Sequence, residues 1–282
     1  MRIFLTGGTG FVGSHFLNQA LAAGHEVVAL RRTRSSTRVD LLKQPVWVTA
    51  SLDDVAPAHL EGIDALVHLA AHTPNPPYAP LAECLYWNAF APLRLAAQAH
   101  AAGVRRFLVA GSCFEYGDAA KALEYVDTDT PLAPNLSYPT SKAAASTAFE
   151  GFTRENSVRL KLLRIFQVYG EGEQASRFWP SLRRAALAGD DFPMSAGRQV
   201  RDFIEVGEVA RQFLQHLDFS GSVDGVPDVR HVATGRAQSL LAFAEDWWKF
   251  WGGSGQLRPG AVPYRKNELF RLVPRPHRQI AD

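Results

Sequence analysis

The chain has 282 residues and a net charge of +2, and 46% of its residues are hydrophobic and 21% charged. These values are typical of a globular protein with a sizeable core, and they give no reason to expect nucleic acid or an anionic membrane as a partner. The two cysteines, Cys84 and Cys113, are too few for a disulfide framework and fit a reducing compartment. The N-terminus lacks a signal-peptide core and no apolar run reaches the roughly 20 residues of a membrane helix, so we expect a cytoplasmic protein.

The first half of the chain alternates short apolar strands with helical stretches. We expect strands at 2–6, 26–30, 46–48, 65–69, 106–110 and 161–165, and helices at 12–23, 87–102 and 141–156. Strands that are separated by helices connect through right-handed crossovers and form a parallel sheet covered on both faces. The pattern therefore predicts an α/β protein with a doubly wound parallel sheet of the Rossmann type.

The regular alternation of strands and helices ends after residue 168. We expect helices at 176–189, 206–217 and 238–251 and a strand at 230–233, followed by a Pro- and Arg-rich C-terminal segment with little periodicity. We interpret residues 1–168, rejoined by 199–234, as a nucleotide-binding Rossmann domain. Residues 169–198 and 235–282 then form a smaller domain that is interleaved with it.

Three glycines follow the first strand directly and open the first helix. Gly7, Gly10 and Gly13 have the spacing that allows a tight bend, close approach of the backbone to a pyrophosphate, and close packing of helix on strand. The N–H groups and the dipole of the helix N-terminus also favour a phosphate. We expect a dinucleotide site with Phe11 and Val12 among its contacts; an ordinary tight turn without a ligand is the alternative.

The end of the second strand indicates which dinucleotide binds. A carboxylate usually holds the ribose 2′-hydroxyl at this point, but here the strand runs into Arg31 and Arg32, with Arg34 and Ser35 nearby. A guanidinium pairs with a 2′-phosphate through two charge-assisted hydrogen bonds. The sequence therefore predicts NADP(H), held by Arg31 and Arg32, with a solvated basic loop as the alternative.

A possible catalytic set follows in the middle of the chain. Tyr138 and Lys142 are four residues apart at the start of a helix, so they share one face. A tyrosine has an ordinary pKa of about 10, and a neighbouring ammonium lowers it. Ser112 ends the preceding strand at the sheet edge where sites of such folds lie. These residues predict hydride transfer in which Tyr138 moves the proton, Ser112 polarises the carbonyl, and Lys142 tunes Tyr138 and holds the nicotinamide ribose.

Taken together, these motifs resemble the extended short-chain dehydrogenase/reductase family, within its NAD-dependent epimerase/dehydratase group that acts on nucleotide sugars. The resemblance covers nearly the whole chain and includes the cofactor turn at 6–13, the fourth-strand motif at 67–71, the Tyr-Gly pair at 116–117 and the Arg-Asp-Phe motif at 201–203. It implies that Ser112, Tyr138 and Lys142 form the catalytic triad.

The resemblance also implies further contacts. The additional cofactor contacts that it implies are Leu52, Leu69, Ala70, Ala71 and Asn88, and the substrate contacts are Gln167, Arg201 and Arg265. It implies a homodimer, joined by the helices at 87–102 and after Tyr138. The spacing of His, Cys and Asp residues predicts no metal site.

Departures from the family pattern narrow the expected activity. Gln167 stands where the family usually has Asn, and Pro139 where a small residue is usual. The 4,6-dehydratases carry an Asp-Glu pair where this chain has Cys113 and Phe114, so an acid and a base for dehydration are missing.

We therefore expect an NADPH-dependent 4-ketoreductase of deoxysugar biosynthesis, acting on a nucleotide-linked 4-keto-6-deoxyhexose. A C4 epimerase with a resident cofactor is the first alternative, and an NADP-binding redox sensor without turnover is the second. The nucleotide and the sugar stay open at this stage.

Overall fold

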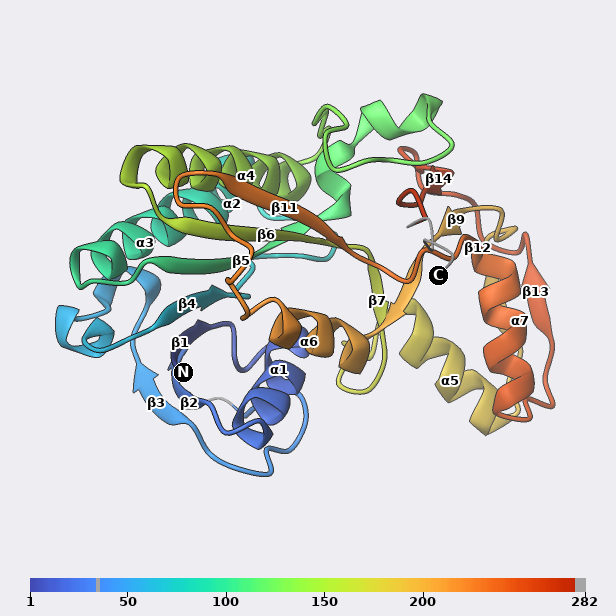
Figure 1. Ribbon diagram of the computed structural model, residues 1–282. Helices are drawn as coiled ribbons and strands as arrows, with labels where there is room; N and C mark the ends of the chain where they lie inside the picture. Colours follow the sequence, from blue (N-terminus) through green and yellow to red (C-terminus); the bar gives the residue numbers. More distant parts are fainter. Residues whose placement is uncertain (34–35, 277–282) are drawn as a thin grey trace, which may run out of the picture.

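A computed structural model describes residues 1–33 and 36–276 of the chain. A large layered domain is built on one wide sheet, and a smaller group of helices and short strands lies beside it (Figure 1). Within the described residues, no helix is long and apolar enough to cross a membrane.

The wide sheet has seven strands, all parallel, in the order β11–β6–β5–β4–β1–β2–β3. Their bounds are β1 (Arg2–Thr6), β2 (Glu26–Arg31), β3 (Val46–Thr49), β4 (Ala65–His68), β5 (Arg106–Ser112), β6 (Arg159–Ile165) and β11 (Pro227–Val232). The strand order reverses between β1 and β4, and ligands of such sheets bind in the crevice at that point. The doubly wound α/β fold predicted from the sequence is confirmed.

Helices cover both faces of this sheet (Figure 1). Helices α1 (Phe11–Ala22) and α6 (Val206–Gln215) pack on one face, and α3 (Ala91–Ala101) and α4 (Ser137–Asn156) pack on the other. The largest buried helix side chains are Phe16, Leu17 and Phe213 on the first face and Leu95 and Phe149 on the second. Full burial of each such side chain contributes about 1.5–3 kcal/mol, so these two layers hold the sheet rigid beneath its carboxyl edge.

The smaller group is built from the second half of the chain. Its elements are α5 (Phe178–Ala188), α7 (Leu240–Phe250), the parallel pair β8 (Phe192–Met194) and β13 (Leu257–Pro259), and β9 (Val200–Arg201) between β12 (Gln238–Ser239) and β14 (Arg271–Leu272). The parallel pair β7 (Gln167–Tyr169) and β10 (Phe203–Glu205) connects this group to the large sheet. Aromatic rings of Trp179, Trp247 and Trp251 pack together between α5 and α7.

Short 3-10 helices complete the described elements. They span Leu52–Asp54, Pro57–Leu60, Cys113–Tyr116 and Asp118–Ala122. The first of them carries Leu52 and the third follows Ser112 directly, so both lie beside predicted site residues.

Two predicted helix starts and the expectation for the C-terminal segment were wrong. The helix expected from residue 87 begins earlier, as α2 (Leu81–Leu85), and passes through a π-helical turn (Tyr86–Phe90) into α3. Helix α4 begins at Ser137 instead of 141, because Pro139 lies in its first turn, where the missing N–H has no helical partner in any case. The C-terminal segment, expected to lack periodic structure, contributes β13 and β14.

The turn between β1 and α1 is the tightest backbone contact of the large domain and generates a testable prediction. A Cβ atom on Gly13 would lie 2.0 Å from the Gly7 carbonyl oxygen, whereas a Cβ atom on Gly151, within α4, would meet nothing within 4 Å. We expect Gly13→Ala to lower the free energy of unfolding by about 1–3 kcal/mol or more. The control Gly151→Ala should raise it by about 0.5–1 kcal/mol.

Urea unfolding followed by circular dichroism measures both changes. If Gly13→Ala were as stable as the wild type, the close packing of this turn would be refuted.

Candidate active site

A cleft of about 930 Å³ opens at the carboxyl ends of the sheet strands. The predicted cofactor and catalytic residues that line it are Gly7, Gly10, Phe11, Val12, Gly13, Arg31, Arg32, Leu52, Leu69, Ala70, Ala71, Ser112, Tyr138 and Lys142. Residues from six separate regions of the sequence therefore meet in one place, as expected for a site at the switch point of a doubly wound sheet.

The glycine turn forms one wall of the cleft. Gly7 has a φ of +79°, and a Cβ atom there would lie 2.5 Å from the Ala70 nitrogen. The first backbone bond of α1 runs from the Ser14 N–H to the Gly10 carbonyl, and no side chain caps this helix. The preceding N–H groups of the first turn are thus left for an anion. This wall fits the pyrophosphate of a dinucleotide.

Cationic side chains gather at the end of β2. Arg31 and Arg32 line the cleft there, and Arg38, a residue that sequence reasoning missed, lines the same cleft and packs against Gly172. The Arg31 guanidinium lies 4.8 Å from the centre of the Trp47 ring, which orients it, and its Nε donates to Thr49 Oγ1 at 3.3 Å. The predicted neighbours Arg34 and Ser35 lie outside the described residues.

The catalytic set comes together at the other end of the cleft. Ser112 arrives on β5, while Tyr138 and Lys142 project from the first two turns of α4. The Lys142 ammonium donates to the Ala110 carbonyl at 2.6 Å. Burial raises the pKa of Tyr138, the charge of Glu115 raises it further, and a hydrogen bond with the Ser112 side chain opposes the rise. Tyr138 is therefore a protonated phenol at neutral pH, and the expectation that Lys142 lowers this pKa was wrong, because burial outweighs every opposing contact.

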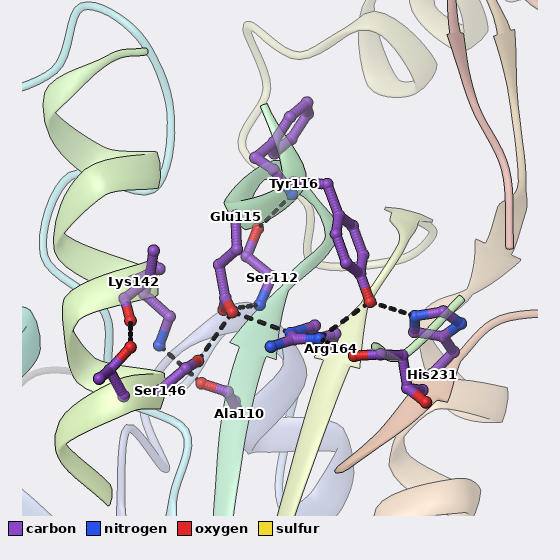
Figure 2. Close-up of polar contacts among 12 residues, drawn as sticks. Ala110, Ser112, Glu115, Tyr116, Lys142, Ser146, Arg164 and His231 are labelled. Atoms are coloured by element: carbon purple, nitrogen blue, oxygen red, sulfur yellow. Dashed lines mark hydrogen bonds and ion pairs between the residues drawn. The ribbon is translucent and has the colours of Figure 1, made fainter. Parts of the chain in front are cut away.

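Two features beside the set were not expected from the sequence. The Tyr78 ring stacks on Tyr138, with ring centres 5.6 Å apart. Glu115 is fully buried and accepts the Ser112 N–H at 2.6 Å, and its carboxylate pairs with Arg164 at 3.0 Å (Figure 2). The Ser-x-x-Glu spacing of a capping box was the one sequence signal for Glu115.

Asn88 is placed differently from its predicted role. It is buried and is not among the described residues that line the cleft. Its side chain accepts the His72 N–H at 2.6 Å and donates to the His72 carbonyl at 3.1 Å and to Ser141 Oγ at 2.9 Å. Asn88 thus ties the loop after β4 to helix α4 and supports the cleft from behind.

A second cleft of about 660 Å³ adjoins the first, between the large domain and the smaller group. It is lined by all three predicted substrate residues, Gln167, Arg201 and Arg265. The hydrogen-bond donors of Arg201 are largely used within the protein, because it pairs with Glu268 at 3.1 Å and donates to the Leu269 carbonyl.

Glu173 lines both clefts and is the only carboxylate among the described residues of the first one. Its side chain is 7% exposed and pairs loosely with Arg177 at 3.5 Å. Burial raises the pKa of Glu173 to about 7. Sequence reasoning gave no sign of this group.

Comparison with known proteins identifies the family. The model of the NAD dependent epimerase/dehydratase family matches residues 3–225. The chain belongs to this family. Two relatives are the UDP-glucose 4-epimerase of Erwinia amylovora, 27% identical over 90% of this chain and 84% of that enzyme, and the CDP-abequose synthase of Salmonella muenchen, 27% identical over 95% of this chain and 87% of that enzyme.

A solved structure agrees with this assignment. MoeE5, in complex with UDP-glucuronic acid and NAD, superposes with a TM-score of 0.81 at 26% identity, covering 97% of this chain and 89% of that one. The resemblance inferred from the motifs is thus confirmed, and the protein is an enzyme of the epimerase/dehydratase family.

Proposed function

We propose that this family member is an NADPH-dependent 4-ketoreductase acting on a nucleotide-linked 4-keto-6-deoxyhexose. The observation that carries the proposal is that Arg31 and Arg32 stand at the end of β2 and line the cleft, at the point where a carboxylate usually holds the ribose 2′-hydroxyl. Guanidinium groups favour a 2′-phosphate over a 2′-hydroxyl. A reductant consumed in each turnover is usually NADPH, whereas a resident cofactor is usually NAD.

The catalytic residues suit reduction. A bound nicotinamide would supply the hydride that reduces C4 of the sugar. Tyr138, protonated because burial raises its pKa, donates the proton to the resulting oxygen while the Ser112 hydroxyl hydrogen-bonds to the same atom. Ala110 occupies one of the three donors of the Lys142 ammonium, which leaves two for ribose hydroxyls. The positive charge of Lys142 then stabilises the phenolate that Tyr138 becomes.

The residues after Ser112 support reduction over dehydration. Cys113 is buried, and burial raises the pKa of its thiol to about 12, so it does not act as a base near neutrality. Phe114 lines both clefts with an apolar ring. Neither position therefore offers a carboxyl group to the clefts, where dehydration would need an acid and a base.

A C4 epimerase is the second candidate. It is favoured by the 27% identity to the UDP-glucose 4-epimerase over most of both chains. Epimerisation would use the same Ser112, Tyr138 and Lys142 but would return the hydride to the sugar, so no reductant would be consumed.

We further propose a nucleotide sugar in the second cleft and a homodimer in solution. Two of the relatives are named for nucleotide-linked sugars, and Gln167 and Arg265 offer polar contacts in that cleft. Leu81, Tyr86 and Phe90 leave apolar side chains exposed along α2 and the π-helical turn, which a second copy would cover.

The proposed reaction predicts stoichiometric loss of NADPH. With a panel of nucleotide-linked 4-keto-6-deoxyhexoses, each mole of sugar reduced should remove one mole of NADPH, measured by absorbance of the reduced nicotinamide. Conversion of a nucleotide sugar without net NADPH loss would replace the reductase by the epimerase.

The arginines predict the cofactor preference. The wild type should bind NADPH more tightly than NADH. Arg31→Ala or Arg32→Ala should weaken NADPH binding and so reduce the difference between the two affinities. Loss of one charge-assisted hydrogen-bonding partner costs about 1.5–3 kcal/mol, which is roughly tenfold to a hundredfold in affinity. Fluorescence titration with both cofactors measures this, and affinity for NADH serves as the internal control because it should barely change. Equal affinity of the wild type for both cofactors would rule out the assignment.

Tyr138 is predicted to be the proton donor. Tyr138→Phe removes one oxygen and keeps the buried ring, so kcat should fall about 10²–10⁴-fold, the usual contribution of a placed general acid. Lys142→Met should weaken cofactor binding as well as lower kcat. The matched control is Tyr78→Phe, which removes the hydroxyl of the stacked neighbour and should keep most of kcat. Near-normal kcat in folded Tyr138→Phe would exclude this residue as the acid.

A further inference from the structure

Glu115 is a fully buried carboxylate directly behind the catalytic set, and it does not contact either cleft among the described residues. It accepts three hydrogen bonds, from the Ser112 N–H at 2.6 Å, from Ser146 Oγ at 2.7 Å and from Arg164 Nε at 3.0 Å (Figure 2). A carboxylate in this environment is costly to bury unless it is fully paired. The groups that donate to Glu115 therefore indicate its role in the site.

The three donors come from three elements that frame the catalytic set. Ser112 ends β5, Ser146 lies one turn after Lys142 on α4, and Arg164 lies on β6. The backbone after Ser112 is fixed as well, because the Phe114 N–H donates to Ser112 Oγ at 3.2 Å and completes the capping box. One carboxylate thus connects the strand that carries the serine to the helix that carries the tyrosine and the lysine.

Arg164 is itself held in place on the far side of Glu115. It donates to Tyr116 Oη at 3.0 Å and to the Thr128 carbonyl at 2.7 Å, and Tyr116 Oη lies 2.5 Å from His231 Nε2 (Figure 2). The guanidinium is 4% exposed and the carboxylate 0%. The pair is therefore shielded from solvent, so water screens the charge of Glu115 only weakly from neighbouring groups.

Lys142 is the catalytic residue on which the charge of Glu115 acts. Its side chain is buried, and burial lowers the pKa of its ammonium while the charge of Glu115 raises it. The other titratable group facing it from a packed element is His68 on β4, which is neutral because burial holds its pKa at about 3. Burial raises the pKa of Glu115, and the charges of Arg164 and Lys142 oppose that rise, while the thiol of the neighbouring Cys113 is neutral at working pH.

We propose that Glu115 is a positioning residue that keeps Lys142 charged and fixes Ser112 relative to helix α4. The inference rests on the catalytic roles proposed above for Ser112 and Lys142. It adds that the ammonium remains protonated in a desolvated site because a buried carboxylate compensates for the lost water. Arg164 balances that carboxylate without reaching the ammonium.

The titration of Lys142 tests this directly. The chain has six lysines, so a protein labelled with ¹³C at lysine Cε gives few signals, and Lys142→Met assigns the relevant one. The titration runs from about pH 6 to 11, to span the ordinary lysine pKa of about 10.4. In Glu115→Gln the Lys142 signal should titrate at lower pH than in the wild type, and Glu115→Asp should restore part of the difference.

Two further variants separate the electrostatic effect from a structural one. Ser146→Ala removes a hydrogen bond to Glu115 but keeps its charge, so the Lys142 titration should stay as in the wild type. Glu115→Gln leaves a lone buried guanidinium and is expected to lose stability. The double variant Glu115→Gln/Arg164→Met removes both charges; it should regain stability and still show the lowered Lys142 titration.

Kinetics give an independent readout. In Glu115→Gln, kcat should fall by about tenfold or more, but by no more than the roughly 10²–10⁴-fold that a placed acid contributes. The decline of kcat at high pH should also begin at a lower pH than in the wild type. If Lys142 titrates as in the wild type in both the single and the double variant, Glu115 is a structural residue only and the inference is wrong. Failure of the proposed function has a different signature, since the wild type would then turn over sugar without consuming NADPH.

Discussion

The contact between the β1–α1 turn and the end of β4 is the constraint on which the site depends. A Cβ atom on Gly7 would lie 2.5 Å from the Ala70 nitrogen, so the two backbones meet only because no side chain separates them. This contact sets the N-terminus of α1 over the crevice between β1 and β4. The ends of the cleft then follow from strand order, because β2 delivers Arg31 on one side and β5 delivers Ser112 on the other. The direction in which a dinucleotide would lie is therefore built into the sheet.

The catalytic end of that cleft is stabilised differently from the rest of the domain. Lys142, Glu115 and Arg164 are all buried within it, and each would be costly without partners. Small side chains on α4, such as Ser141 and Ser146, let the helix approach closely enough to provide those partners. The polar network therefore requires a definite spacing between α4 and β5, whereas the apolar layers elsewhere tolerate substitutions of similar volume. Precision in this part of the fold comes from hydrogen bonds more than from packing.

Sequence reasoning found the parts of the site whose signals are local. The glycine spacing, the two arginines after β2 and the Tyr138–Lys142 pair each lie within one short segment, and parallel strands bring such segments to the same edge. Glu115 and Arg164 were missed because they are 49 residues apart, and the sequence around either residue does not indicate that the other is its partner. For the same reason the pairing of Arg201 with Glu268, 67 residues away, was not foreseen, although Arg201 itself was predicted. The start of α4 was placed too late because Pro139 suggests that a helix cannot include it. A proline is tolerated in the first turn, and that position is known only from the structure.

Family members that share one proton-transfer set must differ in what surrounds it. Phe114 lines both clefts, and the resemblance places a carboxylate of the 4,6-dehydratases at this position, so under the proposed function an apolar ring next to the serine would account for the difference in chemistry. The opposite end of the cleft carries a second difference. Arg32 and Arg38 are exposed to solvent, and contacts between exposed charges are weakened by water and salt. Under the proposed function, such contacts would select for a 2′-phosphate without holding the nucleotide permanently. A cofactor that must leave after each turnover needs this combination, whereas an epimerase that retains its cofactor gains nothing from an open cationic end.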